Sequence, residues 1–338
     1  MNIKKAISPL SSFFSQDSLI KWTGRRTIFP FYHTISDDDL PYISNLYPLR
    51  SIKEFKRDLE YFCKHFTPIN IDEVHNRIQS PSKLKKPAFH LSFDDGLKEV
   101  YEIIAPILEK KGIPATFFVN TDFIDNKKLF YRYKVGLILN NLKQTNSNVL
   151  NKRIEVFLED NSAWNGDLKN SIMHLNYHDQ NLISDIAQIL EIDFADWLLK
   201  HNPYLSTSQI KDLLKRGFTI GSHSVDHPRF RNIDLTIQKS QIVKSFVHLE
   251  KNFDINKRIF SFPFGDEGVS AELFDWMYSE GKCKLSFGVS GIKDDFCPNH
   301  LHRIPMDECQ VDTDKYIKSE FLYFMLKSVF NKNQIKRN

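Results

Sequence analysis

Short apolar runs, each followed by apolar residues at helical spacing, recur along the chain. The clearest run covers residues 89–93, stops at Asp94 and Asp95, and is followed by helical spacing at residues 100–108. Another apolar run, at residues 115–119, comes next. Because a strand, a helix and a strand follow one another here, the pattern predicts a right-handed parallel βαβ unit.

The same two patterns predict further elements on both sides of this unit. Strands are expected at residues 28–32, 218–220, 258–262, 285–289 and 301–306. Helices are expected at residues 13–19, 135–142, 181–190, 194–199, 237–249, 273–277 and from 315 onward. Ser51 and Glu54 have the spacing of a capping box, which predicts one more helix after Ser51. Ser206 and Gln209 predict another helix in the same way.

Residues 125–205 interrupt the alternation of strands and helices. The segment is rich in Asn, Lys and Leu, its periodicity is helical, and it contains no clear strand pattern. We therefore interpret it as a helical insertion or a small subdomain. Two roles are open at this point: it forms one wall of a binding groove, or it is a solvated structural excursion.

The two adjacent carboxylates at the end of the central strand are the first candidates for chemistry. In parallel α/β folds, the carboxyl ends of the strands collect ligands and catalytic groups. Capping of the next helix explains one acid. Two carboxylates side by side at a buried strand end repel each other, unless a cation or a proton-transfer role compensates. We therefore expect Asp94 and Asp95 to be functional.

Two histidines stand four residues apart after another predicted strand. On a helical turn, His223 and His227 would project to one side and share a metal ion. Such a pair also occurs by chance, but this pair follows a strand end, as the two acids do. Two imidazoles and one carboxylate leave positions open for water and substrate, which suits zinc or another divalent ion acting as a Lewis acid.

Three segments together resemble the polysaccharide deacetylase family, also called the NodB-homology family or carbohydrate esterase family 4. Residues 92–96, Ser-Phe-Asp-Asp-Gly, look like its (S/T)-F-D-D-G motif. Residues 223–227, His-Ser-Val-Asp-His, look like its H-(S/T)-x-x-H motif, and the Pro-Phe-Gly of residues 263–265 follows in the expected order. The likeness covers about residues 86–124 and 206–305.

The resemblance implies an α/β fold, namely a distorted (β/α)7-type barrel with a helical insertion. Length alone allows one large α/β barrel or two ordinary domains. We expect five parts: an N-terminal segment 1–27, a first part of a NodB-like barrel 28–124, the helical insertion 125–205, a second part of the barrel 206–310, and a C-terminal helical segment 311–338.

The resemblance further implies a metal-dependent amidohydrolase that removes acetyl groups from the N-acetylated sugars of a polysaccharide or glycan precursor. Asp94 would be the general base that accepts a proton from water. Asp95, His223 and His227 would be the ligands of one divalent metal, for which zinc is expected.

Residues near the other motifs would support this chemistry. A backbone N–H near Phe264, in the Pro263-Phe264 segment, would stabilise the tetrahedral oxyanion together with the metal. Ser224 would steady its loop by hydrogen bonding rather than act as a nucleophile.

The chain departs from the family pattern at two points. Ser261 stands where the third motif has an arginine that orients the catalytic aspartate, so the base is oriented differently or activity is reduced; Arg303, on the last predicted strand, is the hypothetical spatial substitute. The late motif that supplies the general acid is also not clean. His302 is the first candidate for this acid and His33 the second.

Two other readings of the function compete with N-deacetylation. One keeps the metal site and changes the bond, giving an amidohydrolase for another amide or a formyl group, or an O-deacetylase, because the pocket walls choose the substrate. The other is a metal-binding but catalytically idle carbohydrate-binding protein. The departures at the third motif and the acid motif favour it, and the intact Asp94 opposes it.

Composition narrows the partners and the location. The formal net charge is only +4, with no concentrated basic stripe, so nucleic acid is not an expected partner. The four cysteines, which have no CxxC spacing, are expected to be free thiols. Lys4 and Lys5 precede a stretch that Pro9 and several polar residues break, so we expect no export signal and a cytoplasmic location. The basic ends leave peripheral membrane contact open.

Overall fold

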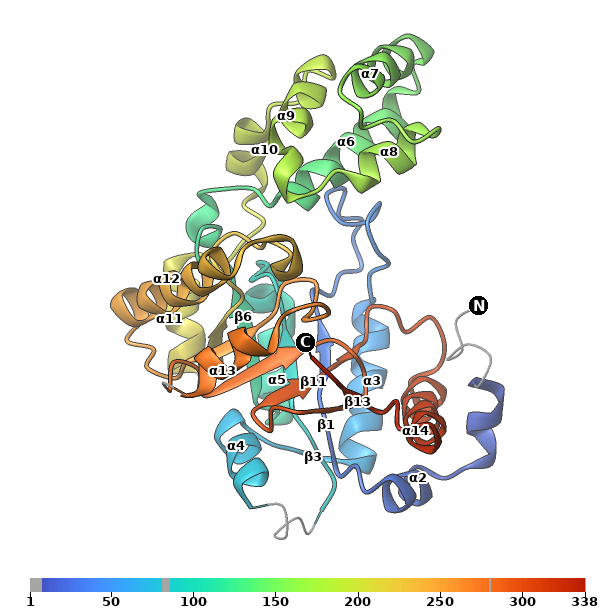
Figure 1. Cartoon of the computed structure of the whole chain (residues 1–338), viewed down its shortest axis with the longest axis vertical. Coiled ribbons are helices and arrows are strands. Elements are labelled where there is room, and N and C mark those ends of the chain that lie inside the picture. Colours follow the sequence, from blue (N-terminus) through green and yellow to red (C-terminus); the bar gives the residue numbers. More distant parts are fainter. Residues whose placement is uncertain (1–7, 81–85, 280, 338) are drawn as a thin grey trace.

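The chain forms a β-barrel wrapped by helices, with a separate group of helices at one end (Figure 1). The structure is a computed structural model that describes residues 8–80, 86–279 and 281–337. Lys4 and Lys5, on which the expectation about export partly rests, lie outside these residues.

The barrel consists of eight strands in the order β11-β9-β8-β7-β6-β5-β2-β12, with neighbours parallel. Their bounds are β2 Pro30–Tyr32, β5 Leu91–Phe93, β6 Ala115–Val119, β7 Thr219–Ser222, β8 Ile259–Ser261, β9 Leu285–Gly288, β11 His300–His302 and β12 Ile304–Pro305. Only Arg303 separates β11 from β12, and these strands pair with β9 and β2, so the ring is nearly closed. This confirms the distorted (β/α) barrel.

The barrel strands are short and almost wholly buried. In β5, β6, β8 and β9 every residue is buried, as expected for parallel strands covered on both faces. The register pairs Phe93 of β5 with Tyr32 of β2 and Phe117 of β6. Many of the 28 phenylalanines fill this core, and the matched register brings the carboxyl ends of neighbouring strands to one edge of the barrel.

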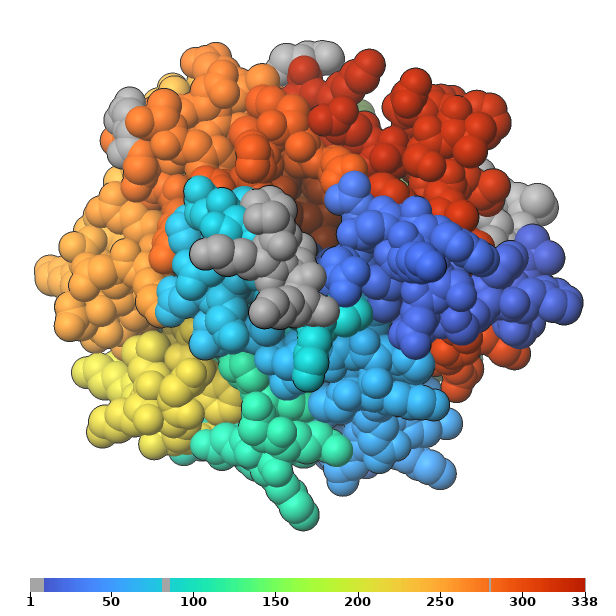
Figure 2. Space-filling view, turned by 90° about the horizontal axis from the view of Figure 1, so that it is seen from below, coloured from blue at the N-terminus to red at the C-terminus, as the bar shows by residue number. Residues whose placement is uncertain are grey.

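A small parallel sheet lies at the amino end of the barrel strands. Its strands are β1 Thr27–Ile28, β3 Thr67–Pro68 and β4 Ala88–Phe89, in the order β1-β4-β3. One residue separates β1 from β2 and β4 from β5, so this sheet continues the barrel strands backwards. Seen from this end, segments of the N-terminal part of the chain, in blue and cyan, lie over the middle of the face (Figure 2). The carboxyl ends of the parallel barrel strands therefore lie at the opposite end of the barrel.

Helices cover the outside of the barrel. They are α2 Gln16–Thr23, α3 Ile52–His65, α4 Ile71–Gln79, α5 Ala105–Lys111 after the π-helix η3 Val100–Ile104, α11 Thr207–Lys215, α12 Leu235–Phe253, α13 Ala271–Ser279 and α14 Thr313–Val329. Short 3-10 helices are η1 Ser8–Phe13, η4 Ile124–Asn126, η5 Tyr177–Asp179 and η6 Phe230–Asn232, and β10 Asp294–Asp295 pairs with β13 Gln334–Ile335. Both predicted capping boxes are present, at Ser51 with Glu54 and at Ser206 with Gln209.

Five helices form the group at the top of Figure 1, which we call the helical subdomain. They are α6 Tyr131–Thr145, α7 Asn148–Asp160, α8 Leu168–His174, α9 Gln180–Ile189 and α10 Phe194–His201. The subdomain has its own apolar core, which Tyr42 from the loop after β2 joins. A β-carbon added at Gly136 of α6 would lie 2.2 Å from the carbonyl oxygen of Tyr42, so glycine allows this close contact. The division of the chain into five parts stays a prediction.

Several expectations about the elements need correction. The first α-helix starts at Gln16 instead of residue 13, because Ser15 caps it, and Phe13 belongs to η1. The last predicted strand is two strands with Arg303 between them. The helices α4, α7 and α8 were not expected.

Two further points concern the cysteines and the membrane. All four cysteines are free, as predicted. None of the helices in the described part of the chain is long and apolar enough to cross a bilayer. The predicted location and peripheral membrane contact stay predictions.

Candidate active site

Asp94 and Asp95 come directly after β5, and both side chains are buried. Asp95 has a φ of 70° and Gly96 a φ of 65°, so the chain turns through two left-handed residues. A β-carbon at Gly96 would approach Cγ1 of Val119 on β6 to 3.0 Å. Positive φ and close packing together explain why glycine follows the two acids.

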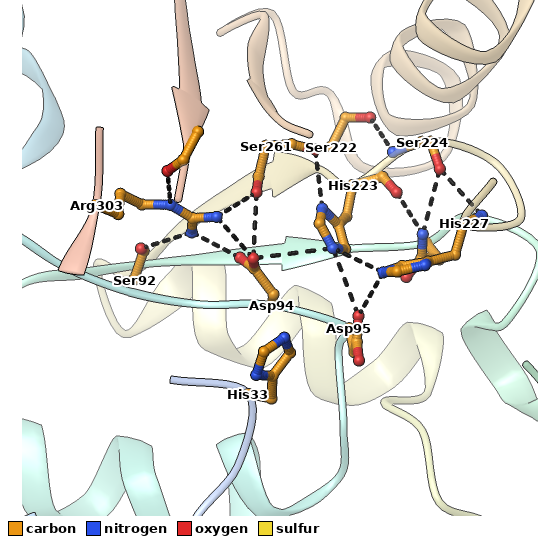
Figure 3. A network of polar contacts seen from close by, with 12 residues as sticks. His33, Ser92, Asp94, Asp95, Ser222, His223, Ser224, His227, Ser261 and Arg303 are labelled. Atoms are coloured by element: carbon orange, nitrogen blue, oxygen red, sulfur yellow. Dashed lines mark hydrogen bonds and ion pairs between the residues drawn. The ribbon is translucent and has the colours of Figure 1, made fainter. Parts of the chain in front are cut away.

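Arg303 holds Asp94 by both carboxylate oxygens (Figure 3). Its Nη1 donates to Oδ1 at 2.8 Å and its Nη2 to Oδ2 at 2.7 Å. Nη2 also donates to Ser261 Oγ at 2.6 Å, and Nη1 to Ser92 Oγ at 3.0 Å. Burial raises the pKa of Asp94, but the charge of Arg303 outweighs it, and the pKa is lowered. The structure thus places Arg303 on Asp94, and Ser261 bridges the two.

The two motif histidines lie together, but not on a helical turn as the sequence suggested. His223 follows β7, and the loop continues to His227 with positive φ values of 71° at Ser224 and 63° at His227. The ring centroids are 4.7 Å apart. The backbone N–H of His227 donates to Ser224 Oγ at 3.1 Å, so Ser224 stabilises the loop, as expected.

Three donor atoms converge beside Asp94 with the spacing of metal ligands. His223 Nε2 and His227 Nε2 are 3.1 Å apart, and Asp95 Oδ1 lies 3.5 Å from the first and 3.2 Å from the second. Ligands about 2.1 Å from a tetrahedral metal ion are roughly 3.4 Å from one another. The three separations therefore fit one divalent ion.

The protonation states of His223 and Asp95 are also those of metal ligands. His223 Nδ1 donates to the carbonyl oxygen of Ser261 at 2.8 Å, which leaves Nε2 with a free lone pair. Burial lowers the pKa of His223 to about 4, so its ring is neutral at pH 7. Asp95 Oδ1 is buried without a hydrogen-bond partner, a costly state that a cation would relieve.

A tyrosine of the helical subdomain completes the surroundings of Asp95. Tyr133 of α6 is buried, and its hydroxyl donates to Asp95 Oδ2 at 2.6 Å. This bond leaves Oδ1 for the histidines. The subdomain therefore contributes directly to the site, in addition to any role as a wall.

His33 lies at the end of β2 and lines the same cavity as Asp94. Its Nδ1 is 2.7 Å from Asp307 Oδ2, which also accepts from the backbone N–H of His33 at 3.1 Å. Burial opposes protonation, but the hydrogen bond and the charge of Asp307 prevail and raise the pKa of His33 to about 9. His33 therefore carries a proton at neutral pH.

His302 is not brought to this cavity. Its ring lies in a second buried group, with Nε2 3.1 Å from Asp295 Oδ2 and Nδ1 3.9 Å from Asp266 Oδ1; His300 joins the same group. Arg337 Nη2 donates to Asp266 at 2.5 Å and to Asp295 at 2.6 Å. A single guanidinium thus already pairs with both acids, and we do not assign a metal there.

The Pro263-Phe264 segment is a tight turn beside the histidines. The backbone N–H of Gly265 donates to the carbonyl of Phe262 at 3.1 Å, and Phe264 has a φ of 58°. Proline in the second position and positive φ in the third are typical of a type II turn, which is strained when the third residue is not glycine. The Phe264 ring packs against His227 with centroids 4.7 Å apart, whereas Pro263 is buried behind it.

The site opens into a cavity of about 740 Å³, a size typical of small-ligand sites. Both the barrel and the helical subdomain line it. Aromatic rings of Tyr47, Tyr131, Tyr177 and Phe264 surround the polar centre. Such rings suit the apolar faces of a sugar.

The family of the chain follows from its sequence. The family model described as polysaccharide deacetylase matches residues 82–273, more than half of the 338 residues. The chain therefore belongs to the polysaccharide deacetylase family, as the motifs suggested, and it is a hydrolase of the amide C–N bond of N-acetylated sugars. No curated protein sequence matches it.

Solved structures with a similar fold include several deacetylases. The deacetylase PplD of Streptococcus pyogenes, solved with acetate, has a TM-score of 0.56 and 14% identity, over 87% of this chain and 97% of its own. IcaB from Ammonifex degensii has a TM-score of 0.54 and 14% sequence identity, and the match covers 88% of this chain and 97% of that one. A de-N-acetylase from Aggregatibacter actinomycetemcomitans has a TM-score of 0.54 and 13% sequence identity, and the match covers 86% of this chain and 99% of that one. At these identities the likeness concerns the fold alone.

Two residues of the site were missed in the sequence. Asp307 comes directly after the last predicted strand, and this position at a strand end was an available signal. Tyr133 had no such signal, because it lies 38 residues from Asp95 within the insertion.

Proposed function

We propose that the chain removes acetyl groups from the N-acetylated sugars of a polysaccharide or glycan precursor, with one divalent metal ion, zinc, held by Asp95, His223 and His227. The observation that supports this most is the convergence of three donor atoms next to an ionised carboxylate, that of Asp94, which is not among them. When bound, the metal would supply Lewis acidity to water and to the acyl carbonyl.

Asp94 is the general base in this proposal. Arg303 keeps its carboxylate ionised and oriented, so that it accepts a proton from the attacking water. Because both oxygens already accept hydrogen bonds from Arg303, Asp94 is fixed before substrate arrives. This arrangement argues against the idle, carbohydrate-binding alternative, since a site that only binds metal has no use for an oriented spare carboxylate.

His33 is the general acid. It lines the cavity on the side of Asp94, and Asp307 keeps it protonated at neutral pH, so it has a proton to donate to the leaving amine. A bound cation would oppose this charge and lower the pKa of His33, which brings the acid closer to the working pH. His302 has no such access to the cavity.

The backbone N–H of Phe264 is the proposed donor to the oxyanion. The strained turn at Phe264 fixes the peptide unit beside His227, so the donor needs no rearrangement during the reaction.

Acetate release from N-acetylated oligosaccharides tests the proposal directly. The wild type should release acetate, and Asp94→Asn, which keeps the shape of the side chain, should not. A parallel panel of O-acetylated and N-formylated sugars separates the proposal from its enzymatic alternatives. Release from O-acetyl or N-formyl substrates only would contradict N-deacetylation.

A further inference from the structure

Two arginines line the cavity without an acidic partner. Arg132 lies on α6 of the helical subdomain, and Arg229 lies in the loop after β7, just beyond His227. Neither forms an ion pair with a carboxylate in the part of the chain that the structure describes. The two cationic side chains come from two different elements that line one cavity.

Arg132 is held in place by neutral groups. Its Nη1 donates to the carbonyl oxygens of Met173 at 2.7 Å and Leu175 at 3.3 Å, at the end of α8. Burial, with the nearby charge of Arg229, lowers the pKa of Arg132. Two guanidinium groups that repel each other in a partly buried wall cost stability, unless an anion binds between them.

Arg229 connects this pair to the catalytic centre. Its guanidinium carbon lies 4.9 Å from the centroid of the Phe264 ring, and His227 packs against the same ring. The Phe264 ring therefore lies between Arg229 and His227, one of the proposed metal ligands.

Four acids line the same cavity; Glu308 is not without a partner, and the other three are engaged away from the two arginines. Asp94 pairs with Arg303, Asp307 with His33, and Asp95 faces the two histidines. The positive charge of Arg132 and Arg229 is thus left for a ligand.

We propose that Arg132 and Arg229 form a subsite for an anionic group of the substrate. This inference rests on the proposed function and specifies its substrate class: an N-acylated sugar that carries a phosphate or a carboxylate. The planar guanidinium fork matches both groups, which accept two parallel hydrogen bonds from it.

Binding of three small probes tests the subsite. The probes are N-acetylglucosamine 1-phosphate, N-acetylglucosaminuronate and the neutral methyl glycoside of N-acetylglucosamine, measured by calorimetry with the metal-loaded protein at two salt concentrations. The wild type should bind at least one anionic probe roughly tenfold to hundredfold more tightly than the neutral one. Comparison of the two anionic probes shows whether phosphate or carboxylate is the group recognised.

Variants of single arginines test which side chain causes the preference for anionic probes. Arg229→Gln should lose the preference for the anionic probe and keep the affinity for the neutral one. Arg231→Gln is the matched control, since it removes the same charge two residues away, where Arg231 already contacts Glu267 at 3.3 Å. Arg229→Gln is preferred to a change at Arg132, because Arg132 also secures the end of α8.

The outcomes separate this inference from the proposed function. Equal binding of all three probes, or an equal loss of preference in both variants, overturns the subsite, and acetate release from neutral oligosaccharides would then still support deacetylation. A preference that depends on Arg229, in a protein that releases acetate from no substrate, supports the subsite and counts against the function.

Discussion

Arg303 and Asp94 form a bidentate pair in which both side chains are buried, although 209 residues separate them in the chain. Arg303 sits in the gap between β11 and β12, where the barrel closes. The closure of the barrel therefore also delivers the group that orients the proposed base. This chain has Ser261 in place of the motif arginine, and the guanidinium comes from the junction between β11 and β12 instead.

We expect Arg303→Lys to shift the acidic limb of the pH-rate profile to higher pH. Lysine keeps the charge but not the fork, so the pKa of Asp94 is lowered less and the carboxylate is held less firmly. Activity at neutral pH should fall roughly 100-fold, as for a slightly misplaced catalytic group. Metal content should not change. An unchanged profile of kcat/KM against pH would sink the idea that Arg303 orients the base.

Asp307→Asn should shift the alkaline limb of the pH-rate profile to lower pH. Asp307 raises the pKa of His33 to about 9, so its neutralisation lowers that pKa, and the acid form is lost at a lower pH as the pH rises. We expect a shift of roughly one to three units. The exposed Asp38→Asn serves as the control. If the alkaline limb stays in place in Asp307→Asn and activity survives in His33→Gln, another group is the acid.

Tyr133→Phe should weaken metal binding by roughly tenfold to hundredfold, since the loss of a group that orients a ligand typically has this effect. The readout is the dissociation constant for zinc, measured by competition with a chelator. Tyr177→Phe is the matched control, because it removes a tyrosine hydroxyl from a carboxylate that is not a ligand, Asp226. Equal zinc affinity in Tyr133→Phe and the wild type would show that Tyr133 has no part in positioning Asp95.

The buried carboxyl of Glu99 should make the free energy of unfolding depend on pH. It is buried next to Thr34, and burial raises its pKa from 4.5 to about 7. The pKa of this carboxyl is higher in the folded state than in the unfolded state. The free energy of unfolding therefore falls as the pH rises from 4.5 to 7, and the loss grows no further above pH 7.

Glu99→Gln removes this cost. Relative to the wild type, its free energy of unfolding should improve by up to about 3 kcal/mol between pH 4.5 and 8. Urea denaturation at both pH values measures the change, with the exposed Glu102→Gln as the control. Parallel pH dependence in Glu99→Gln and the wild type would contradict the assignment.

The sequence predicted the proposed metal ligands because their signals are local. Each pair follows a strand end, and neighbouring parallel strands deliver such residues to one edge. Arg303 was suggested on other grounds, as a spatial substitute on the last predicted strand for the arginine that is missing at position 261. The sequence ranked His302, the neighbour of Arg303, above His33 as the acid, although successive residues of a strand face opposite sides and only His33 lines the cavity. Since Arg303 faces Asp94, His302 had to face away, into the group of Asp266.

Other features required the folded chain. The bond from Tyr133 to Asp95 depends on how α6 docks onto the barrel, which no local pattern specifies. The capping boxes at Ser51 and Ser206 were predictable, because they depend on residues three positions apart. The pairing of His33 with Asp307 joins the first and last strands of the barrel and depends on its closure.

The most direct test combines metal content and acetate release on the same preparations of the wild type, Asp94→Asn and His223→Ala. We predict one divalent ion per chain and acetate release for the wild type. Asp94→Asn should retain the ion and release no acetate, and His223→Ala should lose both. Acetate release by Asp94→Asn, or a wild type that binds no divalent ion under any condition, would contradict the account.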